Sequence, residues 1–94
     1  MLSQIPLNLD KVKKEFVDKE ILRLGMIAEL DAINLYEQMA EYTQNKDIKK
    51  VILDIAREEK THMGEFQTLL LKLDKQQVTE LEAGKKEVEK ELKE

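Results

Sequence analysis

Residues 48–71 have the sequence IKKVILDIAREEKTHMGEFQTLLL, and this stretch decides the fold. An α-helix advances by about 100° per residue, so residues three, four and seven positions apart share one face. The apolar residues that fall within about 40° of Glu59 on such a helix are Ile48, Ile52, Ile55, Met63, Phe66 and Leu70. The spacing therefore predicts a long amphipathic helix whose most apolar face carries a carboxylate at its centre.

A second stretch of the same kind precedes it, from about Asp18, the expected N-cap, to Tyr42. The polar residues 43–47 separate the two stretches, over a length typical of a turn between antiparallel helices. Asn8 or Asp10 is placed to cap a short first helix. We predict an all-α fold, an antiparallel two-helix hairpin with short terminal helices, which is half of a four-helix bundle. Two helices cannot enclose a core, so we expect dimerisation to complete the bundle.

The C-terminal part of the chain is expected to add a third short helix, capped by Asp74 and ending near Ala83. After Gly84 the charges alternate with few apolar residues, which is typical of a solvated helix, a linker or a frayed tail. We therefore expect one helical domain over residues 1–84 and a charged tail or linker over residues 85–94.

The composition argues against several classes of function. The 94 residues contain no Cys and one His, so disulfides and thiolate metal sites are excluded. A net charge of −4 argues against nucleic acid as a partner and is compatible with cations. No apolar run approaches the ~20 residues of a membrane span, and residues 1–6 lack the features of a signal peptide. We expect a cytoplasmic protein that binds neither nucleic acid nor membranes.

Three potential metal ligands fall on the predicted apolar faces. Glu29 lies within the apolar stripe of the first long helix, and Glu59 and His62 are one turn apart on the second. An ionised carboxylate that is buried without a partner costs several kcal/mol, so such groups are protonated, paired or bound to metal. A Glu-x-x-His pair with a Glu from a neighbouring helix is the inward-facing pattern of di-iron and di-manganese bundles. We predict that these three residues bind metal; the alternative is that His62 is a surface or packing residue.

Two further groups of residues have a functional and an ordinary interpretation. Tyr36 is either a core aromatic or a hydroxyl donor to a ligand carboxylate. Asp54, Glu58 and Glu65 lie within about 40° of one another, on the flank nearest His62. They form either a solvated surface or an acidic path that gathers Fe(II) before it reaches the site.

The four central residues form the pattern Glu29-x6-Tyr36-x22-Glu59-x2-His62. This pattern resembles the half-motif of the rubrerythrin and ferritin-like superfamily. Residues 27–33 and 56–62 are more closely similar to the encapsulated ferritins, short two-helix proteins housed within encapsulin nanocompartments. Rubrerythrins and classical ferritins carry two such halves, or four long helices, in one chain, whereas this chain has one.

The resemblance implies a ferroxidase, which oxidises Fe(II) to Fe(III) at a di-iron site shared between two subunits. It implies that Glu59 bridges the two metals while Glu29 and His62 complete each one. Iron is the implied cofactor, and the hard oxygen ligands would also accept Mn or Zn. The implied partners are a second copy of the chain, in a ring of dimers such as a decamer, and an encapsulin shell protein. The implied location is inside the nanocompartment, where the iron is stored.

One feature departs from the family, because the charged residues 85–94 contain no recognisable apolar targeting peptide. Some similar archaeal proteins are fused ahead of the shell protein, so we expect either the linker of a fusion or a chain without its targeting segment. Two other functions stay open, a structural helical dimerisation adaptor without catalysis and a rubrerythrin-like peroxidase. A peroxidase normally needs an electron donor such as a rubredoxin domain, which a chain without Cys cannot supply.

Overall fold

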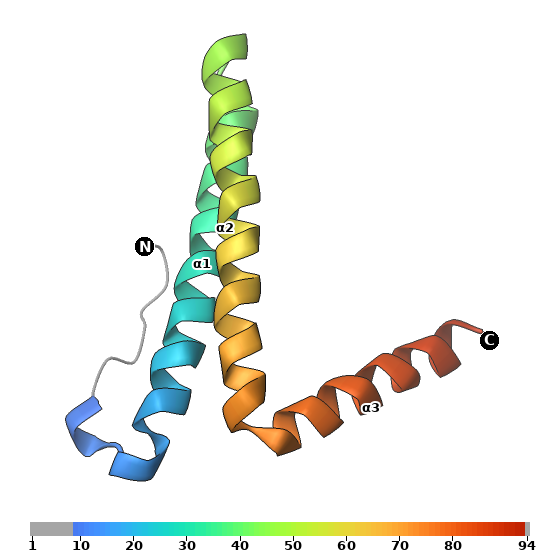
Figure 1. Ribbon diagram of the computed structural model, residues 1–94. Helices are drawn as coiled ribbons and strands as arrows, with labels where there is room; N and C mark the ends of the chain where they lie inside the picture. Colours follow the sequence, from blue (N-terminus) through green and yellow to red (C-terminus); the bar gives the residue numbers. More distant parts are fainter. Residues whose placement is uncertain (1–8, 94) are drawn as a thin grey trace.

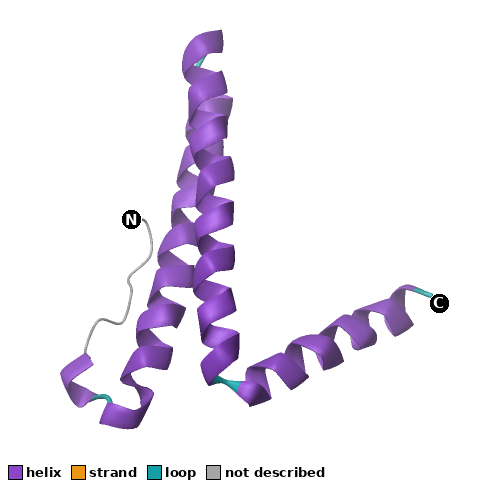
Figure 2. Cartoon of the chain, viewed as in Figure 1, coloured by secondary structure: helices purple, strands orange, loops and turns teal. Residues whose placement is uncertain are grey.

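A computed structural model describes residues 9–93, in which three α-helices follow two short 3₁₀ turns. The elements are η1 (Leu9–Lys11), η2 (Lys14–Phe16), α1 (Val17–Tyr42), α2 (Lys46–Leu73) and α3 (Lys75–Leu92). Figure 2 shows helix along nearly all of the described chain, with short connections. The cap candidate Asn8 and the segment considered for a signal peptide lie outside the described residues. The predicted all-α fold is confirmed.

Helices α1 and α2 run antiparallel and side by side along their length (Figure 1). The turn between them is closed by Asn45, whose side-chain oxygen accepts hydrogen bonds from the backbone N–H groups of Asp47 (2.9 Å) and Ile48 (3.1 Å). This cap satisfies donors that the first turn of a helix leaves free. Helix α2 therefore begins at Lys46, two residues earlier than the apolar periodicity alone indicates.

The start of α1 differs from the prediction. Asp18 is not the N-cap, because α1 begins at Val17 and the cap position belongs to Phe16, which makes no side-chain cap hydrogen bond. The 3₁₀ turn of η2 leads directly into the helix, with the Phe16 N–H donating to the Lys13 carbonyl at 2.8 Å. Asp18 instead lies in the first turn, where its negative charge is favourable next to the helix dipole.

Helix α3 is longer than predicted and points away from the hairpin (Figure 1). It does not end near Ala83 but continues through Gly84 to Leu92. Residues 85–92 are mainly Lys and Glu, which are good helix formers, and they outweigh the single Gly. The division at residue 84 thus falls inside a helix, and a separate tail or linker over residues 85–94 stays a prediction.

The corner between α2 and α3 is fixed by Asp74, which is 9% exposed. Its Oδ1 accepts a hydrogen bond from the Gln77 backbone N–H (3.0 Å), so the predicted cap of α3 is confirmed. Its Oδ2 lies 3.0 Å from Nη2 of Arg23 on α1. One carboxylate therefore joins all three helices.

The hairpin buries few residues. Among the described residues, the apolar side chains that are buried are Ile33, Ala40, Ala56 and Leu70. Large apolar side chains remain exposed along both helices, for example Leu30 (48%) and Val51 (58%). Such surfaces normally face a partner. No helix within residues 9–93 combines the length and apolarity needed to cross a membrane.

Candidate metal centre

The three predicted ligands come together at the middle of the hairpin. Glu29 comes from α1, and Glu59 and His62 come from successive turns of α2. His62 Nδ1 lies 3.7 Å from Glu29 Oε2 and 3.5 Å from Glu59 Oε1. One ligand atom from each residue lies within 4.8 Å of the others, so a single ion could contact all three.

The Glu29 carboxylate has unusual surroundings. Its side chain is 17% exposed, and its Oε2 is buried and accepts no hydrogen bond from any residue in the described range. Burial raises the pKa of Glu29 above its ordinary value, and the hydrogen bond and negative charge of Glu59 raise it further. His62 acts in the opposite direction but does not outweigh them. A bound cation would supply the partner that this oxygen lacks within the chain.

The donor set fits a hard divalent cation. Two carboxylates and one imidazole are ligands that Fe(II) and Mn(II) accept, and Zn(II) also binds such groups. The site opens on one side, because the His62 side chain is 46% exposed while the Glu59 side chain is 20% exposed. The three side chains could therefore supply part of a coordination sphere, with room for further ligands.

Tyr36 is partly buried on α1, as a residue on the apolar face should be. Within residues 9–93 its hydroxyl makes no hydrogen bond to either glutamate. A hydrogen bond from the Tyr36 hydroxyl to a ligand carboxylate therefore stays a prediction.

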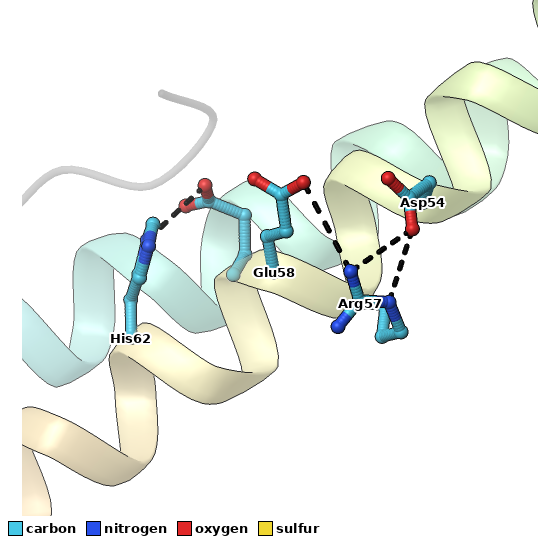
Figure 3. A network of polar contacts seen from close by, with 5 residues as sticks. Asp54, Arg57, Glu58 and His62 are labelled. Carbon is cyan, nitrogen blue, oxygen red and sulfur yellow. Dashed lines mark hydrogen bonds and ion pairs between the residues drawn. The ribbon is translucent and has the colours of Figure 1, made fainter.

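The proposed access path also contains a positive charge. Figure 3 shows Asp54, Glu58 and His62 rising from the same side of α2, with Arg57 between the two acidic residues. Arg57 Nη2 lies 3.0 Å from Asp54 Oδ1 and 4.0 Å from Glu58 Oε1. Since Arg57 follows Asp54 by three residues, the helical spacing could have revealed this pair. Arg57 offsets part of the negative charge of Asp54 and Glu58, and an access path over Asp54, Glu58 and Glu65 stays a prediction.

A second cation forms an ion pair that joins the two helices. Lys60 Nζ on α2 lies 3.3 Å from Glu37 Oε2 on α1. Both side chains are about half exposed, so the pair contributes little to stability. Its two members directly follow Tyr36 and Glu59 in the sequence, so the ion pair lies across the two helices near those residues.

The chain belongs to the rubrerythrin family, because the sequence profile of that family matches residues 20–94. The resemblance to encapsulated ferritins is also confirmed. The crystal structure of an encapsulated ferritin domain from Pyrococcus furiosus is 55% identical, with a TM-score of 0.82 over 96% of this chain and 94% of that one.

Two curated relatives are similar over most of this chain. A ferritin-like-encapsulin shell fusion protein of Pyrococcus furiosus is 59% identical in an alignment of 92 residues that covers 94% of this chain. The encapsulin nanocompartment cargo protein EncC of Myxococcus xanthus is 38% identical in an alignment of 69 residues that covers 70% of this chain. The matched regions span 26% and 53% of these relatives, so each relative is longer than the shared domain.

Proposed function

We propose that this protein is a ferroxidase, which oxidises Fe(II) to Fe(III) at a di-iron carboxylate site built from Glu29, Glu59 and His62. One observation carries the proposal. The buried Glu29 Oε2 has no hydrogen-bond partner in the described chain, yet it faces a second carboxylate and an imidazole. Membership of the rubrerythrin family supports an iron-related function.

The side chains have separate tasks in this proposal. Because burial raises the pKa of Glu29, protons compete with the cation for this carboxylate more strongly than at an ordinary glutamate. His62 directs Nδ1 toward both carboxylates, so a metal-binding imidazole carries its proton on Nε2. Iron held by these residues would supply the redox chemistry, and the chain's own side chains would hold it in place. The protein supplies the geometry and the negative charge that hold the substrate.

We propose that two copies of the chain share the site. One chain offers two carboxylates and one imidazole, which is too few to hold a pair of irons. A two-fold dimer doubles this set, and closed two-fold dimers are the commonest oligomers. In this dimer Glu59 of each chain would be shared between the irons, Glu29 and His62 would complete the ligands of each one, and Tyr36 would support a ligand carboxylate. The dimer also covers the exposed apolar residues of the hairpin.

We further propose that the protein supplies iron for storage inside an encapsulin nanocompartment. The names of both curated relatives, a shell fusion and a nanocompartment cargo protein, support this partner and location. A ring of dimers such as a decamer is the proposed assembly, and α3 together with the rest of residues 85–94 is the candidate link to the shell.

The exposed apolar faces of α1 and α2 favour a second candidate, a structural dimerisation adaptor without catalysis. The two candidates differ in their need for metal. The adaptor predicts that the protein associates equally well in the presence of a chelator and without ferroxidase activity.

The test is the appearance of ferric absorbance after Fe(II) is added in air. We expect wild-type protein to oxidise Fe(II) faster than buffer, and Glu59→Ala to abolish the gain. Glu80→Ala is the matched control, because Glu80 is an exposed glutamate on α3. A wild-type rate equal to the buffer rate would exclude the ferroxidase and leave the adaptor.

A further inference from the structure

Next to the candidate metal centre, α1 and α2 approach each other at a glycine. A methyl group added to Gly25 would lie 2.7 Å from Cε1, 2.8 Å from Cδ1 and 2.9 Å from Cγ of the Phe66 ring. Such distances are far shorter than ordinary contacts between carbon atoms, which are about 3.5–4.0 Å. Gly25 is therefore the residue that allows the Phe66 ring to lie directly against the backbone of α1.

The other glycines in the described helices have no such neighbour. A methyl group added to Gly64 on α2 or to Gly84 on α3 would meet nothing within 4 Å. A glycine in a helix interior is destabilising relative to alanine, so a glycine needs a local reason to be useful there. Of the three glycines, only Gly25 has such a reason. The Phe66 ring is wide and rigid, and it has no flexible end that could move away from an added methyl group.

The position of this contact connects it to the metal ligands. Gly25 precedes Glu29 by one helical turn, and Phe66 follows His62 by one turn on the antiparallel helix. One turn of α-helix is about 5.4 Å long, so the contact lies immediately beside the site. A change in the distance between the helices at Gly25 would shift Glu29 relative to Glu59 and His62.

We propose that Gly25 and Phe66 are positioning residues, which set the distance between α1 and α2 so that the Glu29 carboxylate meets its partners on α2. This inference rests on the proposed metal-binding function. It adds that the ligand geometry depends on one glycine–aromatic contact outside the ligand set. The ligand atoms lie within 4.8 Å of one another, so the site tolerates little movement of α1 relative to α2. A shift of about 1 Å is enough to impair a preorganised site.

The test is a double-mutant cycle on the full chain, with Co(II) alone as the probe. Visible absorbance titrations give both the affinity and the ligand-field bands, which report the coordination geometry. The variants are Gly25→Ala, Phe66→Leu and the combination of the two. We expect each single substitution to weaken Co(II) binding, Gly25→Ala by about 10–100-fold, as for residues that orient metal ligands. We expect the double variant to recover most of the affinity, because the smaller side chain makes room for the added methyl group.

Three controls separate positioning from a loss of stability. Gly64→Ala and Gly84→Ala add the same methyl group in open space, and they should bind Co(II) as the wild type does. Ala40→Gly weakens α1 at a residue that is 1% exposed and 11 positions from Glu29, so it should lower the melting temperature without changing the bands. Circular dichroism and mass in solution confirm that each variant is helical and assembled.

The outcomes are distinguishable. Wild-type protein that binds no Co(II) would refute the metal site and this inference with it. Wild-type affinity and bands in Gly25→Ala would refute the inference alone, as would an equal loss of binding in Ala40→Gly. If Gly25→Ala does not fold, Phe66→Leu decides, and unchanged binding in that variant would overturn the proposal.

Discussion

The middle of the hairpin and the corner between α2 and α3 each contain a carboxylate that is shielded from solvent, but the two differ in their partners. Asp74 at the corner accepts a backbone hydrogen bond through one oxygen and contacts Arg23 through the other. Glu29 in the hairpin has an oxygen without a hydrogen-bond partner in the described chain. The pKa of Asp74 is lowered by the Gln77 N–H and by Lys19 and Arg23, whereas burial raises that of Glu29. Groups of the chain itself therefore satisfy the Asp74 carboxylate. The Glu29 Oε2 would need a group from outside the described chain.

The largest expected effect comes from neutralising these two carboxylates separately. Glu29→Gln should weaken Co(II) binding by more than about 100-fold, since it removes a ligand and not only an orienting group. Its metal-free stability should be unchanged or higher, because the variant removes a carboxylate whose charged form burial disfavours. Asp74→Asn should do the reverse, with near-normal metal binding and a lower melting temperature. A Co(II) titration measures the affinity, and thermal unfolding in the presence of a chelator measures the metal-free stability.

Equal losses of stability in the two variants would remove the distinction between the two sites. A metal-free Glu29→Gln variant that unfolds more readily than the wild type would show that Glu29 is stabilised within the chain. Glu82→Gln is the surface control for both, because Glu82 is an exposed carboxylate on α3, outside the metal centre and the access path.

A smaller effect is expected in the acid stability of the corner. The pKa of Asp74 is lowered in the folded protein, first by the Gln77 backbone N–H. The contribution of ionised Asp74 to the free energy of unfolding is therefore fully present above the pKa of an unfolded aspartate, about 3.9. It is lost as the pH falls through the pKa of Asp74 in the folded protein. Asp74→Asn should thus be less stable than the wild type at neutral pH but equally stable near pH 2, in urea unfolding at each pH. A constant difference across this range would contradict the prediction.

The smallest effect concerns the access path. Replacing Glu58 and Glu65 with Gln should slow Fe(II) uptake a few-fold at low ionic strength, and Arg57→Gln should accelerate it. Both differences should vanish near 1 M salt, where the Debye length is about 3 Å. Stopped-flow oxidation measures the rates, and Glu87→Gln with Glu91→Gln on α3 is the matched charge control. Unchanged rates at low salt would leave an ordinary solvated surface.

The hairpin and its ligand set could be predicted because both follow from helical periodicity. The apolar stripes of α1 and α2 fix which faces meet, and Glu29, Glu59 and His62 lie on those faces. The cap by Asp74 was also predictable, since a cap depends on residues next to it in the sequence.

The remaining features depend on contacts that periodicity does not encode. Arg23 and Asp74 are 51 residues apart, and no local pattern joins them. The contact between Gly25 and Phe66 needs the register of the two helices to be known. Gly84 was interpreted as a helix end, although a glycine stops a helix only where the chain after it leaves the helical path.

The position of iron in a crystal tests the central claim most directly. In crystals grown with iron, anomalous scattering should show two peaks about 3.5–4 Å apart, one on each side of a two-fold axis between subunits. Each iron should be bound by Glu29, Glu59 and His62 in such a way that both chains contribute ligands. A complete di-iron site within one subunit, or a protein that stays monomeric with iron bound, would contradict the claim.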